Sequence, residues 1–288
     1  MKSIPGHRLQ LLTRARWPLA ATGLAVMLFG AVAHTQAADY TLTFTRSPDT
    51  YVTTTGRITT TAFTVEAWIR QPQFDAENQI FNQDISGDAG RLFLTTVNGK
   101  TRFQVGGTQI NGNTTLSSNV WYHLAFVRSA SGASTNYLNG AVDGSGTLTN
   151  AALSAANISI GRLPRVADIG FRGQISDVRV WNFARSRGEI QADMSNRLDN
   201  TRSGLIHYWP LNDGSGTIAT NLASNAHGTI TGATWSDSTD FFLIASTGSW
   251  GVPAGGNWSA TGNWLNAAPA QGTAAAAFSP TTRLPRSP

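Results

Sequence analysis

Short apolar runs, rich in β-branched and aromatic residues, alternate with Gly, Asn and Ser over most of the chain. This pattern extends over residues 39–245 and is typical of an antiparallel β-sandwich. Residues 63–69 alternate in a period of two, which places one face of a strand in a core. Residues 121–127 are apolar on both faces, as expected of a central strand. The sequence therefore predicts an all-β, antiparallel sandwich.

Local signals refine this prediction. Asn98-Gly99 and Asn139-Gly140 lie between strand-like runs and favour tight hairpin turns, because Asn and Gly tolerate positive φ angles. The apolar phase slips at residues 176–177, which predicts a β-bulge.

One short helix is expected directly after this bulge. Ser186 and Glu189 form a Ser-x-x-Glu capping box, which is typical of a helix N-terminus. Ile190, Met194 and Leu198 repeat every four residues, so they would share one apolar face.

Residues 1–38 have the pattern of a signal peptide. Basic residues between Lys2 and Arg16 precede an uncharged apolar run at 19–33, and the small residues at 35–38 suit a signal peptidase. The apolar run is shorter than the roughly 20 residues that span a bilayer. We predict that residues 1–38 are removed, that no membrane span remains, and that the protein is exported to the periplasm, surface or surroundings of a bacterium.

Charge and cysteine usage exclude several classes of function. The formal net charge is +5, but four of the 21 Lys and Arg and none of the 16 Asp and Glu lie in residues 1–38. The remaining chain is therefore nearly neutral, which argues against a nucleic-acid partner. The chain has no Cys, so disulfides, thiol nucleophiles and zinc–thiolate sites are excluded.

The composition changes to Gly, Ala, Asn, Ser and Trp from residue 246, and an Asn-Trp pair occurs at 257–258 and again at 263–264. Such a stretch has little β-branched material with which to form a sheet alone. We therefore predict three parts: a signal peptide at 1–38, the sandwich domain at 39–245, and a separate tail at 246–288.

Several runs, taken in order, resemble the LamG-like jellyroll, or concanavalin A-like lectin/glucanase, superfamily. They are LTFTRSPDTYV at 42–52, FTVEAWI at 63–69, VWYHLAFVR at 120–128, YLNG at 137–140, FRGQISDVRVWNFARSRGEI at 171–190 and GLIHYWPLNDGSG at 204–216. The resemblance covers residues 39–235 and implies a jellyroll of two curved antiparallel sheets. It also implies that ligands bind at rim loops or on a concave face. The tail is similar to the start of an autotransporter-associated β-strand segment, which implies a β-repeat passenger.

Catalytic signatures are absent from the sequence. Glycoside hydrolases of this superfamily carry Glu-x-Asp-x-x-Glu on one strand, and the chain has no such run. Asp75 and Glu77 could share a face, but they follow Pro72 in a loop-like stretch without a third carboxylate. The Gly-x-Ser-x-Gly elbow of serine hydrolases is also missing. We therefore predict that the protein is not an enzyme.

Glu66 and Trp68 are the candidate ligand-binding residues. They face the same side of one predicted strand, where a carboxylate beside an aromatic ring could bind a sugar. In the alternative interpretation Glu66 pairs with Arg70 or Arg179, and Trp68 packs against its neighbours.

Calcium is the one candidate cofactor. Pentraxins, which resemble this chain, hold calcium through acidic rim loops, and Asp88 matches one of their aspartates. Asp84 in the same loop and Asp49 in the first-strand loop complete the candidate ligands. Arg162 and Arg165 replace the carboxylates of the second pentraxin loop.

The function predicted from these features is that of a secreted binding module that recognises a glycan or an extracellular protein. One alternative is the structural leading domain of a truncated bacterial autotransporter or adhesin. The other is a glycoside hydrolase, since superfolds host unrelated activities.

Overall fold

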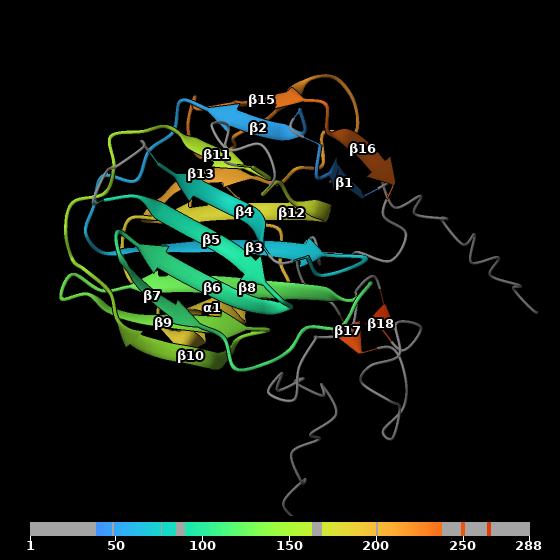
Figure 1. The fold of residues 1–288 in the computed structure, drawn as a ribbon. Coiled ribbons are helices and arrows are strands. Elements are labelled where there is room, and N and C mark those ends of the chain that lie inside the picture. Colours follow the sequence, from blue (N-terminus) through green and yellow to red (C-terminus); the bar gives the residue numbers. More distant parts are fainter. Residues whose placement is uncertain are drawn as a thin grey trace, which may run out of the picture. The chain divides into compact units, whose positions relative to one another are not determined.

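The structure is a computed structural model. It describes residues 39–47, 49–75, 77–84, 90–162, 169–199 and 201–237, together with two short strands, β17 (Ser249–Trp250) and β18 (Trp264–Leu265), which pair with each other. The predicted signal peptide, residues 1–38, and most of the predicted tail lie outside these ranges. Within them the chain folds into two eight-stranded antiparallel sheets and one helix (Figure 1). The predicted all-β sandwich with one short helix is confirmed.

Sheet A is the layer that carries the helix. Its strands are β1 (Tyr40–Thr45), β3 (Phe63–Arg70), β8 (Trp121–Arg128), β9 (Ala133–Leu138), β10 (Ala141–Thr147), β12 (Arg172–Trp181), β13 (Leu205–Trp209) and β16 (Thr234–Asp237). They run in the order β10-β9-β8-β3-β12-β1-β16, and β13 also pairs with β12. Tyr40 is opposite Asp237 in the register of β1 and β16, so the first and last strands of the sandwich are neighbours.

Sheet B is the opposite layer. Its strands are β2 (Tyr51–Thr54), β4 (Asn78–Gln83), β5 (Leu92–Val97), β6 (Lys100–Val105), β7 (Thr108–Asn111), β11 (Ile158–Ile160), β14 (Ile218–Ala219) and β15 (Gly228–Thr231). They run in the order β14-β15-β2-β11-β4-β5-β6-β7. Figure 1 shows β4, β5 and β6 in front of β3 and β8, so the two sheets are stacked.

The core lies between the sheets and is built by alternation. Val65, Ala67 and Ile69 of β3 belong to the main buried cluster, as the period of two predicts. From the opposite sheet, Phe103 meets Phe63 edge-on, with ring centroids 5.9 Å apart. Burying a side chain of this size contributes roughly 1.5–3 kcal/mol, so the stacked faces stabilise the sandwich without disulfides.

The predicted turns and bulge are all present. Asn98 and Gly99 have φ angles of 48° and 78°, and Asn139 and Gly140 have 49° and 72°. These positive values are those of tight hairpin turns that match the strand twist. The register of β12 against β3 shifts between Ser176 and Arg179, which confirms the bulge.

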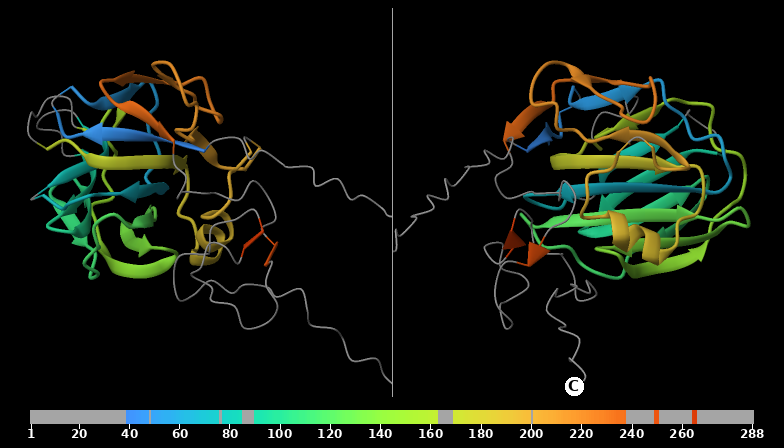
Figure 2. Two further views of the ribbon diagram at one scale, coloured as in Figure 1. Left: turned by 90° about the vertical axis from the view of Figure 1, so that its right-hand side faces the viewer. Right: turned by 180° about the vertical axis from the view of Figure 1, so that it is seen from behind.

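Helix α1 (Arg187–Asp193) begins at the predicted capping box, in which Ser186 Oγ accepts from the Glu189 backbone N–H and the Glu189 side chain accepts from the Ser186 N–H. The helix is shorter than the apolar repeat indicates, because it ends at Asp193 and Leu198 lies beyond it. Seen from behind, α1 lies over the outer face of sheet A (Figure 2). No helix within the described ranges has the length and apolar character needed to cross a bilayer.

Candidate functional site

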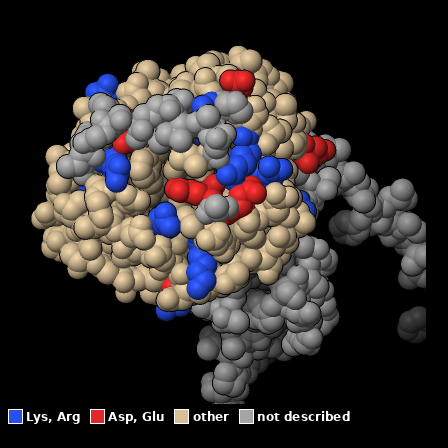
Figure 3. Space-filling model, viewed as in Figure 1, with Lys and Arg blue, Asp and Glu red and all other residues tan. Residues whose placement is uncertain are grey.

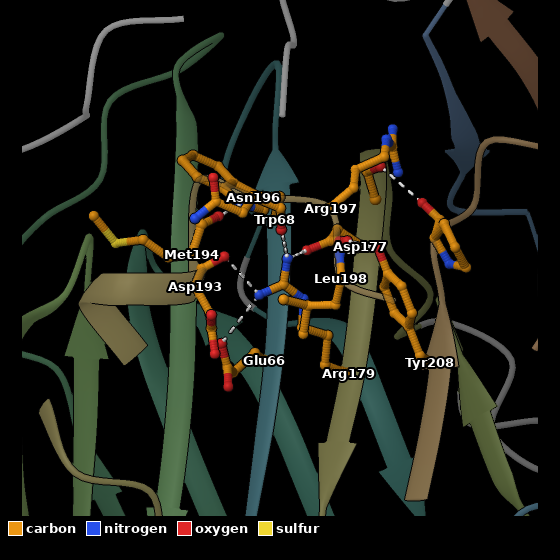
Figure 4. Close-up of polar contacts among 12 residues, drawn as sticks. Glu66, Trp68, Asp177, Arg179, Asp193, Met194, Asn196, Arg197, Leu198 and Tyr208 are labelled. Carbon is orange, nitrogen blue, oxygen red and sulfur yellow. Dashed lines mark hydrogen bonds and ion pairs between the residues drawn. The ribbon is translucent and has the colours of Figure 1, made fainter. Parts of the chain in front are cut away.

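Glu66 and Trp68 lie on the outer face of sheet A, beneath the segment that contains α1. Their side chains are 0 % and 4 % exposed. Trp68 Nε1 donates a hydrogen bond of 2.8 Å to the Met194 carbonyl at the end of α1. Figure 4 shows Trp68 next to Met194 of this segment, and Glu66 lies below Asp193 in the same view. In this structure, the outer face of β3 is therefore closed to a ligand by the chain itself, and the ligand-binding role of the two residues stays a prediction.

Glu66 lies in a cluster among three buried nitrogen-bearing side chains, those of His123, Arg179 and Arg185. Its Oε1 is 2.7 Å from Arg185 Nη1, and its Oε2 is 3.3 Å from His123 Nε2 and 3.8 Å from Arg179 Nη1. Burial by itself would raise the pKa of this carboxyl, but the hydrogen bond and charge of His123, followed by the charges of Arg185 and Arg179, lower it from 4.5 to about 2. Glu66 is consequently ionised at neutral pH, with Oε1 hydrogen-bonded to Arg185 and Oε2 in longer ion pairs with His123 and Arg179.

Arg179 joins this cluster to the segment after α1. Its guanidinium forms an ion pair with Asp177, and it donates to the carbonyls of Asp193, at 3.0 Å, and Asn196, at 2.5 Å (Figure 4). Burial alone would lower the pKa of Arg179, but the charges of Asp177 and Glu66 raise it. The pairing of Glu66 with Arg179 was one of the two predicted options.

The bulge of β12 explains why Asp177 can reach both partners. Asp177 has a φ angle of 55°, and its carboxylate also accepts a hydrogen bond of 2.7 Å from the Tyr208 hydroxyl. Burial, and then the charge of Asp177, raise the pKa of Tyr208, so this hydroxyl stays a donor. A network of buried charges thus fixes the segment that contains α1 against the outer face of β3 and β12.

Two further acids, Asp193 and Asp75, also pair with arginines. Asp193 is 2.5 Å from Arg185 Nη2 and 3.2 Å from Arg202 Nη2. Asp75 Oδ2 is 2.8 Å from Arg46 Nη1 and 3.5 Å from Arg172 Nε. These pairings give Asp75 and Asp193 each two arginine partners, and the predicted lack of enzyme activity stays a prediction.

The candidate calcium ligands are not brought into one group of described residues. Asp49 is exposed between β1 and β2, Asp84 follows β4, and Asp88 lies outside the described residues. Among the side chains that the structure describes, no group of three or more His, Cys, Asp or Glu is arranged to hold a metal ion. Calcium binding therefore stays a prediction.

Sequence reasoning missed the outer face of sheet B, which is polar. Two rows of outward-facing side chains cross its strands in register. They are Thr229, Thr53, Ser159, Asn82, Phe93, Gln104 and Gln109 in the first row, and Gln79, Thr95, Arg102 and Asn111 in the second. We call these two rows the polar face. The alternation of residues within β5 and β6 indicates which of their side chains face outward. It does not indicate which distant strands lie beside them and complete each row.

Hydroxyl, amide and aromatic groups are combined on the polar face. Ser159 Oγ donates 2.8 Å to Asn82 Oδ1, and Asn82 Nδ2 donates 2.7 Å to the Arg162 carbonyl. The Arg91 guanidinium lies 5.7 Å from the centre of the Phe93 ring. Figure 3 views this side of the molecule, where basic side chains are spread widely and the acidic ones gather in fewer places.

The first row of the polar face is buried in its middle and exposed at both ends, with Thr229 exposed and Thr53 half-buried at one end. Asn82 and Ser159 are 1 % and 3 % exposed and Phe93 is 9 % exposed, whereas Gln104 is half-buried and Gln109 is exposed. Amide groups can donate and accept at once, and aromatic rings can pack on the apolar face of a sugar. The exposed end of the row, on β6 and β7, is therefore suited to a ligand with many hydroxyl groups.

The fold and the two contrasting outer faces define a lectin-type jellyroll sandwich. The family model described as the concanavalin A-like lectin/glucanases superfamily (Laminin_G_3) matches residues 46–191, and the chain belongs to this superfamily. The predicted resemblance is therefore confirmed for the sandwich. The autotransporter-like resemblance of residues 246–288 stays a prediction, since most of that segment lies outside the described residues.

Two solved structures illustrate the likeness. A candidate carbohydrate-binding protein from Bacteroides ovatus is 22 % identical, with a TM-score of 0.57 over 70 % of this chain. The chain spans 60 % of that protein's length. The heptameric SAP-like pentraxin of Limulus polyphemus is 17 % identical, with a TM-score of 0.51 over 70 % of this chain and 96 % of the pentraxin. At these identities the comparisons show a shared fold. No curated protein sequence matches the chain.

Proposed function

We propose that this protein is an exported, non-catalytic module that binds a glycan on the polar face of sheet B. The observation that carries the proposal is the contrast between the two outer faces. Over β3, the outer face of sheet A is covered by α1 and sealed by the pairs of Glu66 and Arg179. The outer face of sheet B instead presents amide and hydroxyl groups in register, and part of it is exposed.

The likeness to a candidate carbohydrate-binding protein supports a glycan over an extracellular protein as the ligand. The pairing of Glu66, Asp75 and Asp193 with arginines supports binding without hydrolysis. The signal-like pattern of residues 1–38 supports export.

A glycan array with the full chain, run with and without EDTA, tests the ligand class. We expect binding to a defined set of glycans, and a failure to bind any glycan in either condition would contradict the proposal. Binding that is lost with EDTA would support the calcium prediction. Analysis of the recovered glycans should show no shortened products.

The position of the ligand is tested by a double variant, Gln109→Ala with Asn111→Ala, at exposed positions of β7. Losing two hydrogen-bonding amides should weaken binding by about tenfold to a hundredfold, at roughly 0.5–1.5 kcal/mol for each bond. The matched control is Asn182→Ala, an exposed amide directly after β12 of sheet A. Equal affinity of the double variant and the control would place the ligand elsewhere.

A further inference from the structure

Basic and acidic residues both lie on the side of the molecule that carries sheet B. Glu77, just before β4, accepts a hydrogen bond of 3.4 Å from Gln79 Nε2 of the polar face, and the strands themselves carry the basic residues. Lys100 and Arg102 face outward from β6, since they are opposite Val97 and Thr95 of β5. The outward positions of the described strands of sheet B carry no Asp or Glu, as the two rows of the polar face and their neighbours Tyr51, Val97, Ile218 and Thr231 show. Cations are therefore in excess among the outward strand positions of sheet B.

Arg102 differs from the arginines of sheet A in having no partner. Within the described residues its guanidinium forms no hydrogen bond and no ion pair, and its Nε is shielded from solvent. In the same row, Thr95 Oγ1 and Gln79 Oε1 are also buried without a hydrogen-bond partner. Single buried atoms without a hydrogen-bond partner also occur in the sheet A cluster, at Glu66 Oε2, Arg179 Nε and Arg185 Nε, so the distinguishing feature of Arg102 is that its whole guanidinium lacks a partner. A buried polar atom without a partner costs about 1–3 kcal/mol, so a ligand that pairs with this guanidinium would be favoured.

Arg91 is a second cation on this side of sheet B. It lies two residues before Phe93, and Arg102 lies two residues before Gln104, so the two arginines lie on opposite sides of the Phe93–Gln104 pair. Its Nε donates 3.2 Å to the Gly106 carbonyl, and its guanidinium lies 5.7 Å from the centre of the Phe93 ring. These contacts orient the side chain while leaving its charge without a carboxylate partner among the described residues. By contrast, Arg46, Arg179 and Arg185 each pair with an aspartate or glutamate.

We propose that the glycan bound on the polar face is acidic, with a carboxylate or sulfate group that pairs with Arg102. This inference rests on the proposed function. A guanidinium presents parallel N–H donors that match two oxygens of a planar or tetrahedral anion, and such charged hydrogen bonds are stronger than neutral ones. The amides of Gln104, Gln109 and Asn111, on the same face, would bind the sugar hydroxyls.

Calorimetric titration of the full chain with four polymers tests this inference: polygalacturonate, chondroitin sulfate, a neutral galactan and duplex DNA. We expect binding to at least one acidic glycan, with an affinity that falls as salt is raised, because exposed charges are screened. The first two polymers distinguish a carboxylate ligand from one that needs sulfate. Equally tight binding of DNA would overturn the inference, since it would show attraction to any polyanion.

The variant Arg102→Gln should weaken binding to the acidic glycan at least tenfold, and Arg102→Lys should restore part of it. Arg187→Gln is the matched control, because it removes one exposed positive charge from α1 on the other sheet. An unchanged melting temperature shows that Arg102→Gln still folds. If only neutral glycans bind, and Arg102→Gln binds them normally, the acidic ligand is refuted while the proposed function stands. If no glycan binds at all, both are refuted.

Discussion

Replacing Glu66 by Gln keeps the shape of the side chain but removes the negative charge from the buried cluster. The cost can be worked from the carboxyl pKa, which is lowered from 4.5 to about 2 by His123, Arg185 and Arg179 against the effect of burial. At about 1.4 kcal/mol for each tenfold change, this difference corresponds to about 3 kcal/mol. The side chain is fully buried, so solvent does not screen this contribution. Removing one partner of a buried pair typically costs a similar amount, about 3–5 kcal/mol.

The same pKa predicts how stability depends on pH. The folded pKa of Glu66 is lower than the unfolded one, so the unfolded state binds the proton more readily. The stabilisation is therefore complete above about pH 5 and is lost as pH falls towards about 2. The free energy of unfolding can be measured by urea titration of the full chain between about pH 5 and about pH 2. The values for the wild type and Glu66→Gln should converge at the low end of this range.

The control for this experiment is Asp237→Asn, which removes an exposed carboxylate from β16. It should change the free energy of unfolding by less than about 0.5 kcal/mol, as most surface substitutions do. If Glu66→Gln is as stable as this control at pH 7, the buried pairs of Glu66 contribute nothing and the reasoning fails.

Three further substitutions probe other parts of the fold by urea unfolding at pH 7. Arg179→Met leaves Asp177 without its buried cation and should cost about 3–5 kcal/mol; a neutral result would mean that the segment after α1 is held by other contacts. Gly161→Ala would place a Cβ 2.2 Å from the Phe44 ring at a φ angle of 84°, so we expect a loss of more than about 2 kcal/mol, and wild-type stability would contradict the described packing. Ser186→Ala removes the cap of α1 and should lower the free energy of unfolding by about 1 kcal/mol, whereas Ser186→Asp, which can also cap the helix, should keep most of that stability.

The sequence was informative where structure is decided by neighbouring residues. Strand alternation at 63–69, the Asn98-Gly99 turn, the bulge at 176–177 and the Ser186 cap depend on residues a few positions apart, and each was predicted. The predicted helix is longer than α1, because Leu198 lies beyond its end and packs in a separate buried cluster with Trp181, Leu205 and Tyr208.

The candidate site could not be predicted in the same way. Glu66 binds Arg185, which is 119 positions away, and only the path of the chain over sheet A brings them together. The hydrogen bond of Ser159 to Asn82 joins residues 77 positions apart. The sequence shows that each of these side chains is polar. Whether the side chain is buried under α1 or lies on the outer face of sheet B depends on the order of the strands.

The pairing of β1 with β16 also has a mechanical consequence. Because Tyr40 is opposite Asp237, the chain enters and leaves the sandwich at the same end of two adjacent antiparallel strands. Tension between the flanking segments would load the hydrogen bonds of this pair one after another, as in the opening of a zipper, and not all together in shear. The sandwich should therefore begin to unravel at the β1–β16 edge under low force, while α1 and the polar face are still intact.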